Sequence, residues 1–375
     1  MFNFRRHIAV LLALGLACAA LPACTDDPQV GGSGGGGAGG DGGAGGVAPE
    51  PPGCADDIQW IAGPAIAPAR DHHATFGFTL GEQGFVYVNG GWNYGEVFSD
   101  GFVANVGDGA ETGWSWQAAE ALPATRAGHA VGVVGEQVFI AGGQRPGAFI
   151  DSVITSTVQA DGSLTPWVQT TALPEARFHL AMATSGEQLI VTGGLDRDTF
   201  AASDSVFTTQ VLNGVPAPWQ SSNLPQTVSH HATFVAGSYV YVAGGLRGSP
   251  ADNPTLLAEV WRAPVLAEGG IGAWEQQPDL PQTRTTQSAF VRGRCVYIAA
   301  GFIGGYNYGD EVMAAPFDEE GNLGSWQTLP SRLPAGRSHM HHVALVSDHA
   351  YLLGGSLSYQ NVTGDSAIGT FIHHQ

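Results

Sequence analysis

The sequence predicts an all-β protein built from six repeats, each forming one four-stranded antiparallel sheet. Two markers carry the repeat: a strand-like run that ends in paired glycine, and a tryptophan that keeps the same spacing. The second glycine of each pair stands 51 to 56 residues from the next. No amphipathic helical stretch of ten or more residues lies between the markers. A fold of alternating helices and strands is therefore excluded.

Four markers recur in one fixed order along the chain. An arginine followed by histidine two or three positions later occurs at Arg70, Arg126, Arg177 and Arg337. The glycine pairs end at Gly91, Gly143, Gly194, Gly245, Gly301 and Gly355. An acidic residue follows at Asp100, Asp151, Asp204, Glu259, Asp310 and Asp365. The tryptophans are Trp60, Trp116, Trp167, Trp219, Trp274 and Trp326.

Each repeat is predicted to contain four short strands. In the repeat after Arg126, the first strand runs from His129 to Val134 and the second ends at Gly143. The third alternates from Asp151, and the fourth carries the tryptophan. Gly-Glu-Gln at 135–137 and the Asp-Gly and Asn-Gly pairs at 161–162 and 213–214 predict the hairpin turns. One such sheet cannot bury both faces, so we expect six to pack around an axis as a β-propeller.

The ends of the repeat region are complementary. The last repeat has its arginine, glycine pair and acidic strand, but no tryptophan follows Asp365. The segment 58–61 carries Trp60 and precedes the first complete repeat. We expect this segment to supply the outer strand of the last blade, which closes the ring and removes two open sheet edges.

The order of these markers resembles that of kelch repeats over roughly residues 57–375. The resemblance implies that the first strand of each blade lines the axis and that the tryptophan-bearing strand is outermost. The sequence departs from the pattern at Val228, which replaces an arginine, and at Ala300, which replaces the first glycine of a pair.

Residues 1–23 are predicted to be a signal peptide of the lipoprotein type. Arg5 and Arg6 precede an apolar run at 8–21, which is shorter than the ~20 residues of a membrane-spanning helix. The run ends in Leu21-Pro22-Ala23-Cys24, which resembles the lipobox of bacterial lipoproteins and implies lipidation of Cys24. Because Thr25 follows, we expect anchoring at the outer membrane of the cell envelope. An ordinary cleaved signal with an incidental cysteine is the alternative.

The remaining chain divides into a tether and a folded body. Residues 24–53 are dominated by glycine, which cannot bury apolar surface, so this segment is expected to be a flexible tether. Residues 54–375 are expected to form the propeller.

Charge excludes several classes of function. The chain has 14 basic residues, all arginine, against 33 acidic residues, which gives a net charge of −19. Binding to DNA or RNA needs clustered positive charge, so no nucleic-acid partner is expected. The absence of lysine also excludes Schiff-base catalysis and a P-loop.

The loops after the glycine pairs are the predicted ligand surface. In peptide-binding kelch domains these loops and the repeated arginines form the ligand face. In this chain they carry Trp92-Asn93-Tyr94-Gly95 and the near-duplicate Tyr306-Asn307-Tyr308-Gly309, whose rings suit stacking on sugars or capture of a peptide. The alternative is that these rings only pack over the blade ends and that the arginines anchor loops between blades through carbonyls or the repeated aspartate. The candidate binding residues are Arg70, Trp92, Tyr94, Arg126, Phe149, Arg177, Phe200, Arg284, Tyr306, Tyr308, Arg337 and Tyr359.

Histidines recur where the chain enters each innermost strand, and a ring of imidazoles around a channel can bind Zn or Cu. Their recurrence with the period of the fold favours a structural role, so no metal or other cofactor is predicted. If a metal binds, the densest group is the candidate set: His339, His341 and His342. Cys54 and Cys295 can pair in an oxidising compartment, and two free thiols are the equal alternative.

We expect a monomeric, non-catalytic binding module for a peptide, a protein or a glycan, attached to the membrane only by its lipid. The alternative is a carbohydrate-active enzyme. Kelch-type propellers include enzymes that isomerise sialic acid and copper radical oxidases, and the latter need a Cys–Tyr cross-link. Stoichiometric copper in the purified protein would favour the oxidase.

Overall fold

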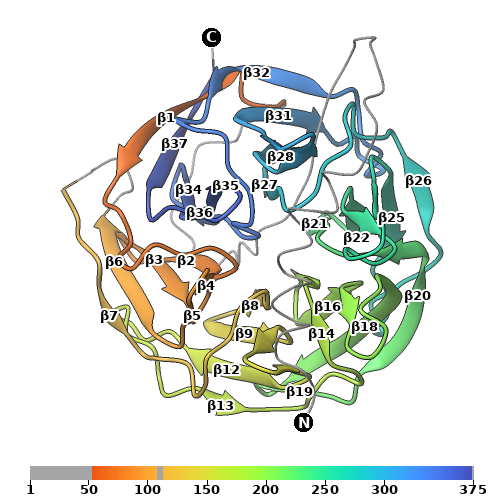
Figure 1. Cartoon of the computed structure of the whole chain (residues 1–375), viewed down its shortest axis with the longest axis horizontal. Coiled ribbons are helices and arrows are strands. Elements are labelled where there is room, and N and C mark those ends of the chain that lie inside the picture. The colour runs from red at the N-terminus through yellow and green to blue at the C-terminus, as the bar shows by residue number, and fades with distance from the viewer. Residues whose placement is uncertain (1–52, 108–112, 374–375) are drawn as a thin grey trace.

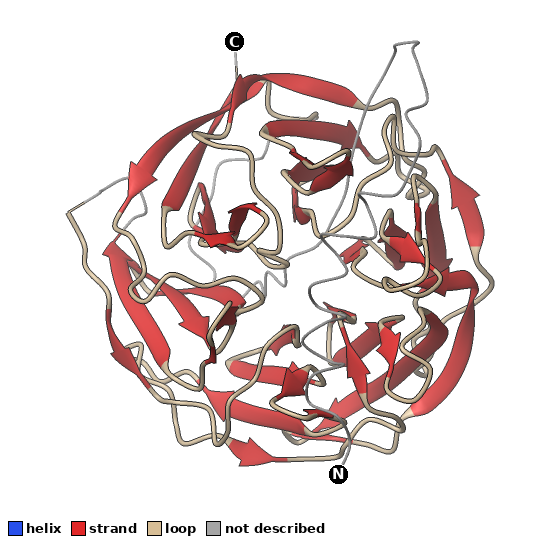
Figure 2. Ribbon diagram, in the orientation of Figure 1, coloured by secondary structure: helices blue, strands red, loops and turns tan. Residues whose placement is uncertain are grey.

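A computed structural model describes residues 53–107 and 113–373, which form a ring of six antiparallel sheets around a common axis (Figure 1). The described residues form strands and loops, with no helix among them (Figure 2). Accordingly, none of the described segments is a helix with the length and apolar character needed to cross a membrane. The predicted signal peptide, Cys24 and the tether up to residue 52 lie outside the described residues.

Each blade has four main strands, which follow one another from the axis outward. Blade 1 contains β2 (Ala74–Leu80), β3 (Gln83–Asn89), β6 (Gly101–Gly107) and β7 (Gln117–Ala119). Blade 2 contains β8 (Ala130–Val134), β9 (Gln137–Ala141), β12 (Val153–Thr157) and β13 (Val168–Gln169). Blade 3 contains β15 (Ala181–Ser185), β16 (Gln188–Thr192), β18 (Ser203–Leu212) and β20 (Gln220–Val228), with β19 (Val215–Pro216) paired to the end of β18.

The other three blades have the same order. Blade 4 contains β21 (Ala232–Ala236), β22 (Tyr239–Ala243), β25 (Val260–Pro264) and β26 (Glu275–Gln277). Blade 5 contains β27 (Ser288–Arg292), β28 (Cys295–Ala299), β31 (Glu311–Pro316) and β32 (Gln327–Arg332). Blade 6 contains β33 (Ala344–Val346), β34 (His349–Leu353), β37 (Ser366–Ile372) and β1 (Asp57–Gly63).

Short two-stranded ribbons follow the glycine pairs, and the sequence did not predict them. Five are hairpins: β4 (Trp92–Asn93) with β5 (Glu96–Val97), β10 (Gln144–Arg145) with β11 (Ala148–Phe149), β23 (Leu246–Arg247) with β24 (Thr255–Leu256), β29 (Phe302–Gly304) with β30 (Asn307–Tyr308), and β35 (Ser356–Ser358) with β36 (Asn361–Val362). In blade 3, β17 (Leu195–Asp196) pairs instead with β14 (Arg177–Phe178).

The second strand of each blade is buried on both faces because each blade is packed between two others. In β3, the side chains of Val86, Tyr87 and Val88 are completely buried. This explains why these strands are continuous apolar runs and not alternating ones. The predicted turns are also present, and Asn213 and Gly214 both have the positive φ that a two-residue hairpin requires, at 51° and 80°.

The ring closes as the sequence predicted. Strand β1 pairs with β37 along its whole length, from Asp57 opposite Ile372 to Gly63 opposite Ser366, so the first strand lies beside the last in Figure 1. Ile58 of β1 is completely buried. A Cβ on Gly369 would lie 2.7 Å from both Ile58 and Trp60, so glycine permits this close approach.

The closing strand is tied to blade 5 as well. Cys54, just before β1, forms a disulfide with Cys295 at the start of β28, with the Cα atoms 5.2 Å apart. The Asp57 carboxylate accepts hydrogen bonds from the backbone N–H and the hydroxyl of Ser331, at 3.0 and 2.6 Å. The first described residues therefore cross-link the last two blades.

The arginine and glycine markers form a lock between neighbouring blades. The N–H of Gly91 in blade 1 donates to the carbonyl of Arg126 in blade 2 at 2.8 Å. The same bond recurs in each blade, and the N–H of Gly355 in blade 6 donates to the carbonyl of Arg70 in blade 1 at 2.9 Å. The fixed order of the markers follows from this contact.

Candidate functional site

Six residues, each two positions after the arginine marker or its substitute, line the axis of the ring. They all have positive φ, between 52° and 60°. The N–H of each donates to the carbonyl of the corresponding residue in the preceding blade, at 2.8 to 3.1 Å, so the six hydrogen bonds form a closed circle. This axial ring consists of His72, Gly128, His179, His230, Thr286 and His339.

A pocket lies over one side of the axial ring and is lined by four blades. Blade 1 contributes the ring residue His72 and the aromatic residues of β4 and its turn, and blades 4, 5 and 6 contribute the opposite walls. The lining residues are Asp71, His72, Trp92, Tyr94, Leu246, Pro250, Pro254, Thr285, Thr286, Phe302, Tyr306, Tyr308, His339 and Tyr359. We call this the aromatic pocket.

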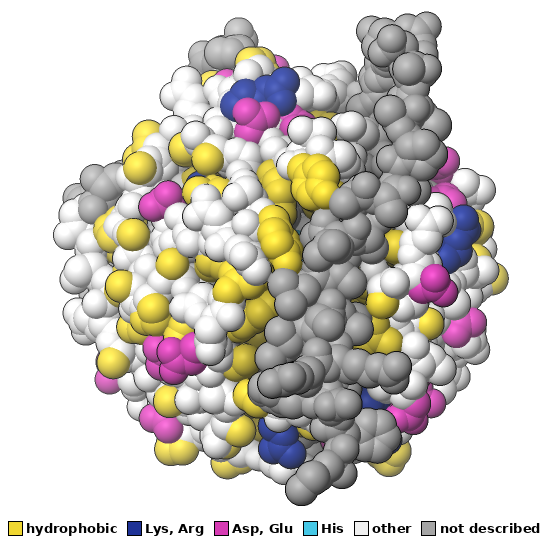
Figure 3. Space-filling view, viewed as in Figure 1, with side chains coloured by type: hydrophobic (Ala, Val, Ile, Leu, Met, Phe, Trp, Pro, Cys, Tyr) yellow, Lys and Arg dark blue, Asp and Glu magenta, His cyan; other side chains and the backbone are white. Residues whose placement is uncertain are grey.

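The aromatic rings of the pocket contact one another in a chain that ends on the axial ring. Tyr359 and Tyr94 meet with centroids 6.0 Å apart, Tyr94 and Trp92 at 5.2 Å, and Trp92 and His72 at 5.5 Å. Tyr94 and Tyr306 are 40% and 54% exposed, so both present ring surface to a ligand. Figure 3 shows hydrophobic side chains near the middle of one face of the molecule, with most visible charged groups toward the rim.

Five of the predicted aromatic residues are brought together in this pocket: Trp92, Tyr94, Tyr306, Tyr308 and Tyr359. The two near-duplicate motifs stand at different distances from their glycine pairs. Trp92 directly follows Gly91, whereas Tyr306 lies in the turn between β29 and β30. Both motifs nevertheless reach the same pocket, from blades 1 and 5.

The other two predicted aromatic residues lie elsewhere. Phe149 is buried against Phe178, with ring centroids 5.2 Å apart, and Phe200 packs on Phe149 at 5.7 Å. They form a separate cluster over blades 2 and 3 with Leu195. We therefore leave Phe149 and Phe200 out of the candidate site.

The five predicted arginines are all buried and bonded internally, and none of them lines the aromatic pocket. Four donate to the carbonyl of the first residue of their own glycine pair: Arg70, Arg126, Arg284 and Arg337. Arg70 also pairs with Asp100, and Arg177 donates to Ser203 and Ser205. Their guanidinium groups hold the blades in position and are not available to a ligand.

The floor of the pocket holds a buried carboxylate. Oδ1 of Asp71 lies 2.6 Å from Nδ1 of His72, and Oδ2 accepts a 2.5 Å hydrogen bond from the Ser356 hydroxyl. Burial works against the charge of Asp71, but His72, His339 and Ser356 together hold the pKa of this carboxyl below its usual value. Burial also raises the pKa of Tyr94, so its hydroxyl stays protonated and can donate a hydrogen bond.

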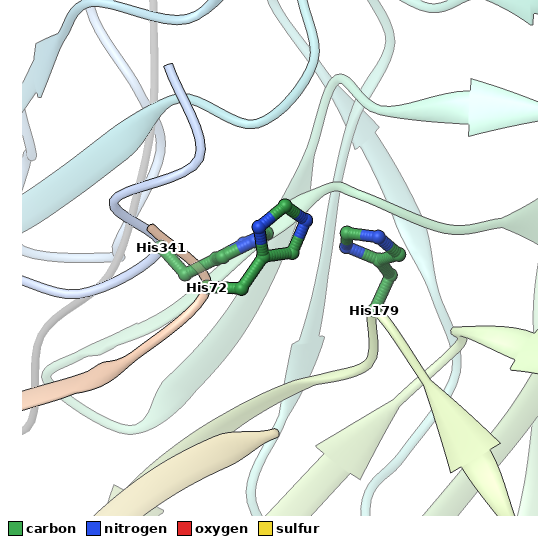
Figure 4. A group of neighbouring side chains, drawn as sticks. All are labelled: His72, His179 and His341. Atoms are coloured by element: carbon green, nitrogen blue, oxygen red, sulfur yellow. The ribbon is translucent and has the colours of Figure 1, made fainter. Parts of the chain in front are cut away.

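Around His72, imidazoles converge from three blades (Figure 4). Potential ligand nitrogens of His72, His179 and His341 all lie within 4.8 Å of one another. Burial, followed by the neighbouring imidazoles, lowers the pKa of His179 and His341 well below the usual value. Of the predicted metal candidates, only His341 belongs to this group. His339 contacts its edge, with its ring centroid 4.6 Å from that of His72. His342 instead contacts the entry to blade 1, where its Nδ1 lies 3.5 Å from the carbonyl of His73.

Sequence reasoning missed the non-aromatic wall of the pocket. Leu246 directly follows a glycine pair, so its position was readable from the repeat. Pro250 and Pro254 lie in the long connection between β23 and β24, and no repeated marker points to them. Asp71 stands between the arginine marker and the axial ring in a position that varies between repeats.

Comparisons with known proteins agree with the architecture. No family model matches the chain. It is 26% identical over 254 residues to Kelch-like protein 34 of Homo sapiens, which covers 64% of this chain and 36% of that protein. It is 23% identical over 216 residues to Kelch-like protein terF of Aspergillus terreus, which covers 56% of this chain and 45% of that protein. The chain thus spans less than half of these relatives.

Among solved structures, the chain is similar to YjhT, with a TM-score of 0.64 and 12% identity over 80% of this chain and 95% of that one. At this identity the likeness shows the fold alone. The six four-stranded blades, the repeated markers and these likenesses together define the class of the protein. It folds as a six-bladed β-propeller of four-stranded, kelch-type blades.

Proposed function

We propose that this protein is a non-catalytic binding module that captures a neutral glycan in the aromatic pocket. The observation that carries the proposal is the composition of that pocket. Tyrosine and tryptophan rings supply flat apolar surfaces with polar edges, which suit the apolar faces and the hydroxyls of a sugar ring. Thr285 and Thr286 on the opposite wall add hydroxyl oxygens that carry no charge. Their O–H groups donate to the carbonyls of His230 and Thr285, so these oxygens can only accept hydrogen bonds from a ligand.

No arginine is among the described lining residues, which argues for a neutral ligand. Recognition of a carboxylate or a phosphate favours arginine, which binds such groups with two parallel hydrogen bonds. Every arginine predicted for the ligand face is instead used inside the ring. An epimerase acting on sialic acid, which carries a carboxylate, is therefore the less favoured alternative.

A copper radical oxidase is also less favoured. That chemistry needs a cysteine cross-linked to a tyrosine, and Cys295 is bonded to Cys54 in the structure. Cys54 and Cys295 are the only two cysteines after the predicted lipidation site. The thiol required for the cross-link is thus already used in joining β1 to blade 5.

The decisive experiment is a glycan array and a peptide array probed with the full chain carrying Cys24→Ser, which keeps it free of lipid. We expect neutral glycans among the hits, and Trp92→Ala and Tyr306→Ala each to weaken the best hit at least tenfold. Phe200→Ala is the matched control, because it removes a half-buried ring outside the pocket. Binding that survives both pocket variants, or hits confined to peptides, would contradict the proposal.

We also propose that the mature protein is a monomer anchored to the outer membrane by a lipid on Cys24. The lipobox-like sequence supports the anchor. The proposal predicts that the protein enters the detergent phase on Triton X-114 partitioning and that the Cys24→Ser variant stays in the aqueous phase. Equal partitioning of the two would contradict it.

A further inference from the structure

The axial ring carries more histidine than its backbone requires. Four of its six positions are His72, His179, His230 and His339, all in the left-handed region of φ. Glycine adopts this conformation without steric cost, whereas a residue with a Cβ is strained there. Gly128 occupies the equivalent position in blade 2 and makes the same hydrogen bonds. Strained residues of this kind cluster at functional sites, so these imidazoles are candidates for a function.

The imidazoles at the centre have nitrogens without partners. His72 and His179 are 4% and 2% exposed. Neither nitrogen of His179 has a hydrogen-bond partner among the described residues, and the same holds for Nε2 of His72 and Nε2 of His341. A buried polar atom left unpaired is costly, and native structures retain few of them without a reason. A cation shared by these nitrogens would satisfy all three rings together.

The spacing of the rings suits a metal. Potential ligand nitrogens of His72, His179 and His341 lie within 4.8 Å of one another, close enough to share one ion. The lone pair of a neutral imidazole nitrogen is the group that binds a metal ion. The buried carboxylate of Asp71 adds a positioning contact, because it lies 2.6 Å from Nδ1 of His72. Donation of the Nδ1 proton to a carboxylate leaves Nε2 as the ligand atom, the arrangement seen around ligating histidines.

We propose that His72, His179 and His341 bind one divalent late transition metal ion, Zn²⁺ or Cu²⁺, at the floor of the aromatic pocket. Imidazole is the preferred ligand of both ions, and three histidines leave a fourth position for water or a ligand. The side chains come from blades 1, 3 and 6, so the ion would join blades that are not all neighbours (Figure 4). Because His72 also lines the pocket, an ion here would meet whatever the pocket binds.

The test is titration of the full chain, purified without a histidine tag and stripped with a chelator, with Zn²⁺ alone and with Cu²⁺ alone. Calorimetry and elemental analysis should give one equivalent per chain for at least one of the ions. Electron paramagnetic resonance of the Cu²⁺ form should show coupling to imidazole nitrogens. No binding of either ion, or Cu²⁺ without nitrogen coupling and no Zn²⁺ binding, would overturn the proposal.

The glycine in the axial ring suggests how to remove a ligand without disturbing the backbone. His179→Gly copies the residue at position 128, so the backbone keeps its φ of 52° without strain while the ligand is removed. We expect affinity to fall at least 100-fold. His230→Gly makes the same change at the neighbouring ring position, outside the three proposed ligands, and should retain affinity within threefold. Equal affinity of His179→Gly and the unaltered chain, or equal loss in both variants, would overturn the assignment.

Two further variants keep the result interpretable. Replacing His373 and His374 together by alanine removes an adjacent histidine pair that can bind metal on its own. This variant should still bind one metal ion per chain. Loss of binding in that variant would assign the ion to the chain end and refute the proposed site. Asp71→Asn should weaken binding 10- to 100-fold, the usual effect of losing such a positioning carboxylate. Thermal melts of the metal-free variants check that each one folds.

Discussion

The most informative stability prediction concerns the strand that closes the ring. Ile58 and Ile61 lie three residues apart on β1 and differ only in environment. Ile58 is completely buried in a cluster with residues of blades 5 and 6, whereas Ile61 is 45% exposed. Replacing each by alanine removes the same atoms and the same strand preference, so the difference between the two variants measures how firmly β1 is integrated into the ring.

The expected loss of unfolding free energy follows from how deeply each isoleucine side chain is buried. Truncating Ile58 removes three buried carbons, worth about 0.8 kcal/mol each in transfer free energy, and leaves a cavity, so about 2–5 kcal/mol of unfolding free energy should be lost. Ile61→Ala, at an exposed position, should change stability by about 0.5 kcal/mol or less. Guanidinium denaturation of the disulfide-bonded protein, followed by tryptophan fluorescence, measures both changes.

A closed ring also predicts the shape of the denaturation curves. The Ile58→Ala midpoint should move as a single cooperative transition, because loss of closure exposes the edge of β37 and the contacts of β1 with blade 5 together. Similar small effects from Ile58→Ala and Ile61→Ala would refute the packing argument. An early separate transition that leaves the main midpoint unchanged would show that β1 is an accessory strand.

Three further predictions concern charge, protonation and the cross-link. Burial opposes ionisation of Glu311, but Arg284 holds its pKa below the usual value; stability from this pair is therefore complete above pH ~4.5 and is lost as pH falls through the lowered pKa. Glu311→Gln should cost about 2 kcal/mol at pH 7 and progressively less below pH 4, as measured by denaturant midpoints. Burial lowers the pKa of His231 to about 3, so below pH ~6.5 the unfolded chain takes up a proton that the folded chain does not. The free energy of unfolding therefore decreases as the pH is lowered. His231→Gln, patterned on the glutamine of blade 5, should therefore gain about 2 kcal/mol relative to the unaltered protein between pH 7 and pH 5, and equal slopes would contradict this. Replacing Cys54 and Cys295 by serine should cost about 2–5 kcal/mol, and reductant should bring the unaltered protein to the same midpoint.

The repeat made the architecture predictable from the sequence. The glycine pairs and tryptophans define six sheets because each marker makes the same contact in every blade, as the hydrogen bond from Gly91 to Arg126 shows. The orphan Trp60 segment predicted the closure, because an unfinished last blade and an unattached first strand complement each other. The strand bounds agree within a few residues, as for the strand predicted from His129 and observed from Ala130.

The site was only partly predictable, because it depends on contacts across the axis. No spacing shows that the turn bearing Tyr306 reaches the pocket that Trp92 lines, while Phe200 turns to a different cluster. Which aromatic side chains reach the pocket depends on the length of each hairpin and on which blades face one another across the axis. The repeated arginines allowed two interpretations, as ligand groups or as anchors between blades, and their hydrogen bonds to carbonyls agree with the second.

The axial ring shows how a repeat can support a single site. Its backbone circle needs only the left-handed conformation, which Gly128, Thr286 and four histidines all adopt. The side chains at these positions are therefore free to differ without loss of the ring. Function is expected where the repeats diverge, as they do in the loops that carry Trp92 and Tyr306.

The proposed function requires that the ligand bind over the axial ring, in the aromatic pocket. The most direct test is a crystal structure of the protein with the strongest neutral glycan from the array. We expect a sugar ring stacked on Trp92, Tyr94 or Tyr306, with its hydroxyls toward Thr285 and Thr286. A glycan bound on the outer rim or on the opposite face, with the aromatic pocket empty, would contradict it.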